Sequence, residues 1–373
     1  MKPATIRAWA WVHTWSSLVS TVFMLLLCLT GLPLIFHHEI DEALGIIAPA
    51  AMADGTPASV DRLAAAALSD HPGRVIQYIG WDGHDPARAF VILNGAADAH
   101  PNDSITVNYD AARAQKLGPA TSAVMQVVLR LHVDMFAGLP GKLFLGAMGA
   151  LLVAAIVSGV VLYWPFTRRL AFGTIRNRRR TNWLDLHNLT GIVTATWLAV
   201  VGLTGVINTL SEPLIGRWKA TELNAMIADH RNGPAAAATA SLDAVLAAAR
   251  AAAPGMEAAF IAFPGSGFST ASHYGVFLRG MTPLTSRLLQ PVLLDAATGA
   301  MAETRHLPWY LTAILFSQPL HFGDYGGLPI KIIWSVLDIV SIVVLGSGLY
   351  LWWSRRRATK AAHSTCTRLA DVA

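Results

Sequence analysis

Four histidines in apolar segments are the residues of this chain whose type and spacing indicate chemistry. His13 and His187 occupy matched positions in two segments that repeat at a shift of 174 residues. His132 and His321 do the same in two segments that repeat at a shift of 189. A polar side chain in an apolar segment is costly and commonly faces a bundle interior or a cofactor. The pairing favours one shared function over four separate structural hydrogen bonds or interface anchors.

The repeats extend beyond the histidines. At the shift of 189, Ser158-Gly159 matches Ser347-Gly348, and at the shift of 174, Leu29-Thr30-Gly31 matches Leu203-Thr204-Gly205. Self-similarity of this extent indicates a duplicated unit. We therefore predict two parallel repeats, each of which supplies two histidines.

The composition is typical of a membrane protein, with 54% hydrophobic and 14% charged residues. A helix that crosses a bilayer needs about 20 apolar residues. The first candidate is expected to remain in the mature protein, because its apolar run of 23 residues is long for a signal peptide. We predict an α-helical four-span bundle, with spans from Thr14 to Phe36, Leu143 to Thr167, Leu189 to Ser211 and Ile332 to Trp353.

Basic residues gather at one end of the predicted spans. They are Arg168, Arg169, Arg176, Arg178, Arg179 and Arg180 between spans two and three, Arg355, Arg356, Arg357 and Lys360 after span four, and Lys2 and Arg7 before span one. Short loops rich in Arg and Lys stay in the cytoplasm. We therefore predict a bacterial inner-membrane protein with both termini cytoplasmic and both long connections periplasmic. An anionic leaflet explains these charges better than nucleic acid does, and no nucleic-acid partner is expected.

Each long connection is predicted to fold as a small α+β module, with Ser59 and Ser241 as helix N-caps and three strands after each helix. The expected strands run from Arg74 to Trp81, Ala89 to Leu93, Ser104 to Tyr109, Ala258 to Phe263, Tyr274 to Arg279 and Pro291 to Leu294. The predicted order is transmembrane helix 1 (1–38), the first module (39–120), an interfacial helix plus transmembrane helix 2 (121–167), a cytoplasmic loop (168–182), transmembrane helix 3 (183–211), the second module (212–305), an interfacial helix plus transmembrane helix 4 (306–353) and a cytoplasmic tail (354–373).

Two facing imidazoles without thiolate or carboxylate partners suit the two axial positions of a haem iron. A zinc ion would require three or four ligands, which the pairs alone do not supply. Ser17 and Gly191 each lie four residues after a histidine of the first pair, on the same helix face. These small residues leave room for a flat macrocycle, although close packing between membrane helices would produce the same pattern.

The chain resembles the PepSY-associated transmembrane family, and within it the inner-membrane di-haem ferric-siderophore reductases of the FoxB type. The residues that carry the resemblance are Val12 to Trp15, Thr30 to Glu39, Leu131-His132, Leu186 to Gly191 and Tyr350 to Trp353. The resemblance implies PepSY-like modules, b-type haem bound by the spans, and outward electron transfer. From the paired histidines we predict two haems per chain, an inner one held by His13 and His187 and an outer one held by His132 and His321. It also implies that ferric siderophore is the substrate, with iron(III) reduced to iron(II) on the periplasmic side.

No Gly-x-Gly-x-x-Gly fingerprint for NAD or flavin is present, so a reductase of this kind would need a separate electron donor. We expect a cytoplasmic flavin reductase or the quinol pool. Two alternatives remain open. The first is a non-enzymatic PepSY scaffold that binds a periplasmic partner, and the second is a siderophore or metal permease, for which an acid within span four is the main support.

Further residues are candidates for secondary roles. Lys142 and Lys331, each just after a Gly-Leu-Pro turn, are placed to pair with haem propionates or to reach the membrane interface. Charged and aromatic residues near the predicted outer face or within a span are candidates for a substrate or proton site: His37, His38, Glu39, Asp134, Asp324, Tyr325 and Asp338.

Overall fold

The structure, a computed structural model, describes residues 2–47, 58–83, 85–100, 103–119, 121–167, 172–177, 179–230, 238–283 and 285–370. Arg168, Arg169 and Arg178 of the predicted basic cluster lie outside these residues. The chain divides into two compact units. The membrane unit comprises Met1–Phe36, Val127–Leu210 and Leu320–Ala373, and the sheet unit comprises His37–Gln126 and Ser211–Pro319.

Within the described residues, four helices of the membrane unit are long and apolar enough to cross a bilayer. They are α1 (Pro3–Ile35), α5 (Gly138–Thr167), α6 (Arg179–Thr209) and α11 (Gly327–Ala370). The prediction of four spans is confirmed. Helix α11 continues beyond the last apolar residue of its span as far as Ala370.

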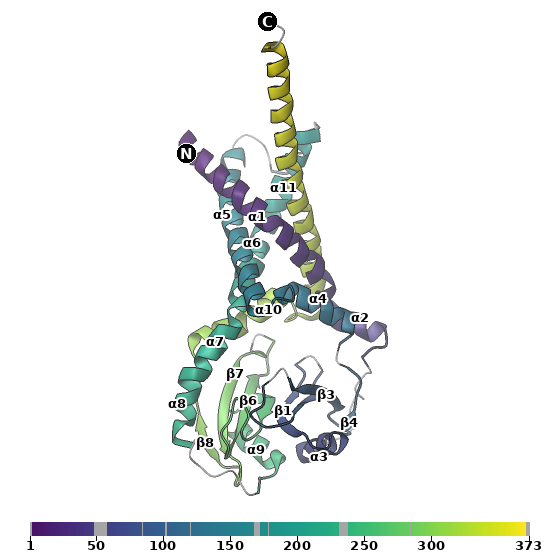
Figure 1. Ribbon diagram of the computed structural model, residues 1–373, viewed down its shortest axis with the longest axis vertical. Coiled ribbons are helices and arrows are strands. Elements are labelled where there is room, and N and C mark those ends of the chain that lie inside the picture. The colour runs from purple at the N-terminus through teal and green to yellow at the C-terminus, as the bar shows by residue number, and fades with distance from the viewer. Residues whose placement is uncertain are drawn as a thin grey trace. The chain divides into compact units, whose positions relative to one another are not determined.

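The four long helices pack in a closed cycle: α1 on α5, α5 on α6, α6 on α11 and α11 on α1 (Figure 1). Small residues allow close approach, as expected between membrane helices. A Cβ added to Gly149 of α5 would lie 3.0 Å from Cγ2 of Val206 on α6. Buried hydroxyls are satisfied within their own helix, as for Ser20, which donates to the Ser16 carbonyl at 2.9 Å. This internal bonding is required where no water is available.

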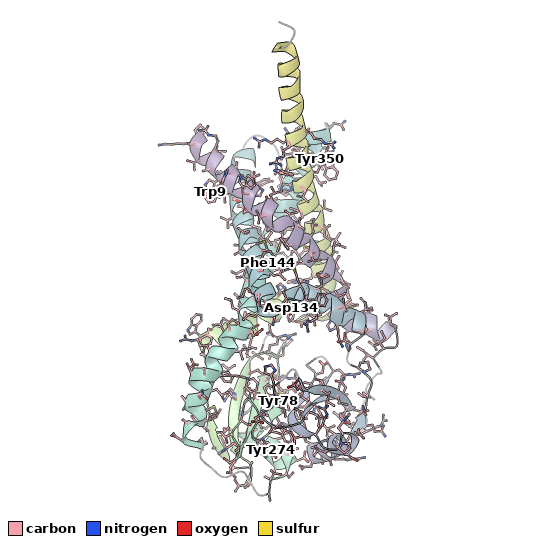
Figure 2. All side chains as sticks on the ribbon, in the orientation of Figure 1. Trp9, Tyr78, Asp134, Phe144, Tyr274 and Tyr350 are labelled. Carbon is pink, nitrogen blue, oxygen red and sulfur yellow. The ribbon has the colours of Figure 1, made fainter. Side chains whose placement is uncertain are left out.

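Two shorter helices, α4 (Ala123–Asp134) and α10 (Trp309–Phe322), precede α5 and α11. The turn from α4 to α5 contains two consecutive non-glycine residues in the left-handed region, Met135 at φ 51° and Phe136 at φ 62°. Asp134 supports this turn, because its Oδ1 accepts a hydrogen bond from the Phe136 amide at 2.8 Å. Figure 2 labels Asp134 at this position.

The sheet unit contains one antiparallel sheet of eight strands in the order β4-β3-β2-β1-β5-β6-β7-β8. The first module supplies β1 (Val75–Trp81), β2 (Arg88–Asn94), β3 (Ile105–Asp110) and β4 (Gln115–Lys116), and the second supplies β5 (Met256–Ala262), β6 (His273–Gly280), β7 (Leu289–Asp295) and β8 (Met301–Thr304). The six predicted strands are confirmed. The sequence did not reveal the short β4 and β8, nor that the two modules share one sheet through β1 and β5.

One helix from each module, α3 (Val60–Asp70) and α9 (Leu242–Ala252), packs on this sheet. The predicted N-caps are confirmed: the Ser59 hydroxyl accepts from the Arg62 amide, and the Ser241 hydroxyl accepts from the Ala244 amide. Alternating strand residues such as Ile79, Val91, Ile261 and Val276 are fully buried beneath the two helices, in one core that includes residues of both modules. Burial of this apolar surface is the main force that holds the modules together.

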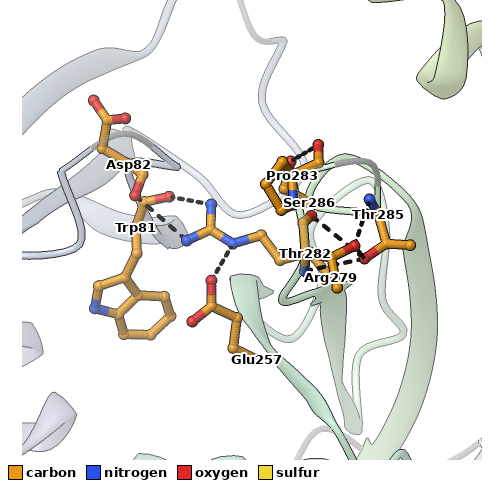
Figure 3. Close-up of polar contacts among 8 residues, drawn as sticks. All are labelled: Trp81, Asp82, Glu257, Arg279, Thr282, Pro283, Thr285 and Ser286. Atoms are coloured by element: carbon orange, nitrogen blue, oxygen red, sulfur yellow. Dashed lines mark hydrogen bonds and ion pairs between the residues drawn. The ribbon is translucent and has the colours of Figure 1, made fainter. Parts of the chain in front are cut away.

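A buried arginine links the two modules near the β1–β5 pair that joins them. Arg279 of β6 donates from Nε to Glu257 Oε1 at 2.9 Å (Figure 3). Its two Nη atoms reach the main-chain carbonyls of Trp81 at 3.5 Å and Asp82 at 3.4 Å, at the end of β1. Its charge is therefore compensated by an acid of its own module and by carbonyl dipoles of the other.

Short helices complete the sheet unit. They are α2 (His37–Ala43), α7 (Ser211–Trp218), a π-helical turn (Lys219–Leu223), α8 (Asn224–Ile227) and a 3₁₀ turn (Ala228–His230). Trp218 is buried against Phe268 and Phe277, with ring centres 6.2 and 6.4 Å away.

Candidate functional site: two imidazole pairs in the membrane unit

The first predicted pair is brought together by helices α1 and α6. The ring centres of His13 and His187 are 6.4 Å apart, and the ring planes are inclined by 65°. The two residues are 174 positions apart in the chain, so only the packing of the long helices creates this proximity.

The second pair has nearly the same geometry. His132 near the end of α4 and His321 near the end of α10 have ring centres 6.4 Å apart and planes inclined by 61°. Both histidines belong to the membrane unit. The structure therefore brings together both of the residue pairs that the internal repeats predicted.

In the first pair, each imidazole is held by a main-chain carbonyl of a further helix. Nδ1 of His13 lies 2.8 Å from the Ala155 carbonyl oxygen on α5, and Nδ1 of His187 lies 3.1 Å from that of Val344 on α11. A carbonyl oxygen only accepts hydrogen bonds, so Nδ1 must carry the proton. Nε2 of the neutral ring is then left with a free lone pair, which is the atom that binds a metal.

The second pair follows the same rule. Nδ1 of His321 lies 3.0 Å from the Val201 carbonyl oxygen on α6, and His132 hydrogen-bonds to the Leu27 carbonyl on α1. Burial, together with the neighbouring imidazole, lowers the pKa of His132 to about 4, and burial also lowers the pKa of His321. Both rings are therefore neutral at physiological pH, as metal ligation requires.

The spacing of the rings matches two ligands on opposite sides of one metal ion. A metal–imidazole bond is about 2 Å long and the nitrogen lies about 1 Å from its ring centre, which puts two trans imidazoles about 6 Å apart. Both pairs, at 6.4 Å, meet this requirement. Within the described residues no group of three or more His, Cys, Asp or Glu is placed to hold a metal ion. Two imidazoles at this spacing are a donor set that a haem iron could use, since its other four ligands belong to the porphyrin.

The two pairs are far apart along the helices. The Thr30 hydroxyl on α1 lies 2.8 Å from Nδ1 of His132, so this residue marks the level of the second pair. Thr30 is 17 residues after His13, and Thr204, which contacts His321, is likewise 17 residues after His187. At about 1.5 Å per residue, the pairs are separated by about 26 Å along each helix.

Aromatic side chains occupy the region between the pairs. Phe23 of α1 meets Phe144 of α5 edge-on with ring centres 4.8 Å apart (Phe144 is labelled in Figure 2). Trp197 of α6 meets Trp334 of α11 edge-on at 6.3 Å. Phe23 and Trp197 each follow a histidine of the first pair by ten residues, so the two contacts lie at similar depths.

The predicted small residues beside the first pair have different surroundings. The Ser17 hydroxyl donates to the His13 carbonyl of its own helix at 2.6 Å. A Cβ added to Gly191 would meet only Cγ1 of Val344, at 4.0 Å, so space remains at this glycine. Lys142 and Lys331 are partly buried near the starts of α5 and α11.

The remaining candidates lie on several elements of the two units. His37, His38 and Glu39 lie on α2 in the sheet unit. Asp324 and Tyr325 lie in the turn before α11, where the Tyr325 ring contacts Trp334 at 5.9 Å. Asp134 is buried at the end of α4. Asp338 is buried within α11 and hydrogen-bonds to Cys28 of α1, a contact that sequence reasoning did not identify.

The fold and these two pairs define a four-span membrane protein with an imidazole pair near each end of its bundle. The chain belongs to the PepSY-associated transmembrane family, since the model of the PepSY-associated TM region matches residues 10–355. The predicted family is thereby confirmed. The chain is also similar to the uncharacterized protein PA4219 of Pseudomonas aeruginosa, with 27% identity over 262 residues. That match covers 64% of this chain and 65% of the relative, slightly less than two thirds of the relative's length.

Proposed function

We propose that the protein is a haem-dependent oxidoreductase that carries electrons across the membrane. The observation that supports this most directly is the pair of imidazole contacts at 6.4 Å, in which Nδ1 of each ring faces a main-chain carbonyl. Nε2 is then the nitrogen that would bind a metal. In this proposal His13 and His187 hold one b-type haem, and His132 and His321 hold the other. A bound haem supplies a one-electron carrier whose potential depends on its ligands and surroundings.

The chain's own residues do the remaining work. The four carbonyl contacts fix the ring orientation and keep Nδ1 protonated, so that the ligands need no reorganisation when iron changes charge. The aromatic contacts between Phe23 and Phe144, and between Trp197 and Trp334, fill the region between the pairs without introducing charge. Lys142 and Lys331 are proposed to pair with propionates.

The basic residues favour an inner-membrane location with both termini in the cytoplasm. In that orientation the His13–His187 pair is on the cytoplasmic side, the His132–His321 pair is on the periplasmic side, and both modules are periplasmic. We further propose that the two halves are parallel repeats. The matched histidines, the matched carbonyl contacts and the symmetrical strand order support this.

Ferric siderophore is the proposed electron acceptor, on the FoxB-type resemblance. One electron per ion converts iron(III) to iron(II), which siderophores bind weakly. The donor is proposed to be a cytoplasmic flavin reductase or membrane quinol. A direct test mixes dithionite-reduced protein, freed of excess reductant, with a ferric hydroxamate and an iron(II)-specific chelator. Reoxidation of the haem with matching iron(II) release supports this substrate, whereas unchanged spectra exclude it.

The haem assignment is tested by optical spectra and haem quantification on the detergent-purified chain. We expect about two haems per chain with sharp reduced α-bands, and about one after His187→Ala or His321→Ala. His71→Ala serves as the control, because His71 caps α3 in the sheet unit. A colourless protein from haem-replete cells would contradict the proposal and favour the non-enzymatic scaffold. About one haem per wild-type chain would restrict ligation to a single histidine pair.

A further inference from the structure

We propose that each imidazole is positioned by a hydroxyl–glycine dipeptide on the neighbouring helix, and that these four dipeptides set the reduction potentials of the two haems. This inference rests on the haem ligation proposed above. The dipeptides are Thr30-Gly31 facing His132, Ser158-Gly159 facing His13, Thr204-Gly205 facing His321 and Ser347-Gly348 facing His187.

The first contact is between the hydroxyl and Nδ1. The distances from Nδ1 are 2.8 Å to Oγ1 of Thr30, 3.3 Å to Oγ of Ser158, 3.4 Å to Oγ1 of Thr204 and 3.0 Å to Oγ of Ser347. In every case the main-chain carbonyl that also faces the ring belongs to the residue three positions before the hydroxyl: Leu27, Ala155, Val201 and Val344. The same two-acceptor arrangement thus occurs four times.

The protons of the hydroxyls determine the direction of these bonds. Each hydroxyl donates to a carbonyl of its own helix, at 2.7 Å from Thr30 to Leu26, 2.7 Å from Ser158 to Ala154, 2.7 Å from Thr204 to Val200 and 2.9 Å from Ser347 to Val344. A hydroxyl has one proton to donate, so towards the imidazole it must act as an acceptor. The Nδ1 proton is therefore shared between a hydroxyl and a carbonyl, and Nε2 gains electron density.

The second contact is between the glycine and the ring edge. A Cβ added to the glycine would lie 3.4 Å from the imidazole Cε1 at Gly31, 3.1 Å at Gly159, 3.1 Å at Gly205 and 3.4 Å at Gly348. These distances are tighter than, or at the limit of, ordinary van der Waals contact. Glycine therefore lets the ring approach the helix backbone closely enough to reach both acceptors.

These contacts have a functional consequence. A ligating histidine whose other nitrogen donates to an acceptor is a more basic ligand, and such outer contacts commonly change metal affinity by about 10–100-fold. A more basic ligand favours the ferric state and lowers the potential. Removing one acceptor should raise the potential of that haem alone, while the haem in the other pair keeps its own.

Helix α11 provides a test with matched controls on one element. Ser347→Ala removes an acceptor from His187, whereas Ser341→Ala removes a buried hydroxyl that donates to the Leu337 carbonyl of its own helix at 2.7 Å. Gly348→Ala adds a methyl group against the imidazole, whereas Gly346→Ala adds one where nothing lies within 4 Å. Ser347→Thr retains the hydroxyl and should restore the wild-type value.

The readouts are the potential of each haem by spectroelectrochemical titration and the low-spin ferric signals by electron paramagnetic resonance. We expect Ser347→Ala to raise the reduction potential of the haem held by His187. At a fixed potential, the ratio of oxidised to reduced haem in that pair should then fall by about tenfold. We expect Gly348→Ala to alter its ferric signal. The haem of the other pair reports whether each variant is folded.

The outcomes separate the two proposals. If His187→Ala retained both haems, the proposed ligation itself would be contradicted. Ser347→Ala and Gly348→Ala could each keep two bis-histidine haems whose potentials and signals equal those of the wild type and of both controls. That result would overturn the positioning role alone. If Ser347→Ala does not fold, Gly348→Ala compared with Gly346→Ala decides the question in the same way.

Discussion

Asp61 of α3 and Asp243 of α9 each hydrogen-bond to the first turn of the other's helix. Asp61 Oδ1 accepts from the Leu242 amide at 2.8 Å, and Asp243 Oδ1 accepts from the Val60 amide at 3.0 Å. The first amides of a helix have no partner within the helix, and an acidic side chain there also complements the helix dipole. The exchange ties the two modules together at their helix N-termini.

Removing either side chain should destabilise both helices. We expect Asp61→Ala or Asp243→Ala to cost about 1 kcal/mol, the usual cost of a lost cap. The cost of the double variant should differ from the sum of the two single costs, because both hydrogen bonds join the same two helix N-termini. Hydrogen exchange of α3 and α9 peptides in the full chain measures this. Arg62→Ala, an exposed substitution in the same turn, is the control. Faster exchange in the mutated helix alone would contradict the reciprocal arrangement.

The same aspartate predicts a pH dependence. Burial acts to raise the pKa of Asp61, but hydrogen bonds from the Ser241 hydroxyl and the Leu242 amide outweigh it, and the net pKa is lowered. A carboxyl with a lowered folded-state pKa stabilises the fold above its unfolded value of about 3.9, and the contribution is lost as the pH falls through the folded value. Protection of α3 and α9 should therefore weaken below about pH 4. Asp61→Asn should reduce this weakening, and an unchanged acid profile would exclude Asp61 as its source.

Arg279 should be important for the shared sheet, because it contacts both modules (Figure 3). We expect Arg279→Met to cost about 1.5–3 kcal/mol, the range for hydrogen bonds that involve a charged group. Glu257→Gln should cost less, since Glu257 is 41% exposed in its side chain and water replaces the lost pairing. Chemical denaturation followed by tryptophan fluorescence measures both. A larger loss in Glu257→Gln than in Arg279→Met would contradict this reasoning.

The sequence predicted the imidazole pairs because a duplication makes equivalent residues recognisable without any knowledge of helix packing. It did not predict the partners of Nδ1. A main-chain carbonyl such as that of Ala155 has no residue-type signature, and its position depends on the rotation of one helix against another. The Ser158-Gly159 and Ser347-Gly348 match was visible in the sequence. Its relation to the histidines required knowledge of which helices are neighbours.

The shared sheet was also beyond the sequence. Each strand of the two modules has a local pattern and local turn residues, so six of the eight strands could be predicted individually. The pairing of β1 with β5 joins residues such as Ile79 and Ile261, which are far apart in the chain. No local pattern encodes that contact. The two-residue β4 is too short to show any alternation.

The left-handed residues after α4 provide a stability test close to His132. A non-glycine residue in this region costs about 1–2 kcal/mol, and glycine avoids the cost. Met135→Gly should therefore stabilise the membrane unit by up to about 1 kcal/mol, after the entropy of the unfolded chain is considered. Val133→Gly, a substitution within helix α4, should instead destabilise it by about the same amount. Thermal unfolding in detergent compares the two variants. If Met135→Gly lowered the stability, contacts of the Met135 side chain would stabilise the fold by more than the left-handed backbone costs.

Cys28 and Asp338 join α1 to α11 within the bundle. Oδ2 of Asp338 has no hydrogen-bond partner among the described residues, and the residue is 7% exposed. An intramembrane carboxyl is costly and is a candidate for proton uptake when the bundle gains an electron. On the proposed haem ligation, we expect Asp338→Asn to retain both haems but to reduce the difference between haem potentials measured at pH 6 and pH 8. Cys28→Ser, which keeps a donor to the carboxyl, should preserve that difference. Identical pH dependence in the wild type and Asp338→Asn would instead identify Asp338 as a structural link between the two helices. In that case Asp338→Leu should be at least as stable as the wild type, because it removes a buried acceptor that lacks a partner among the described residues.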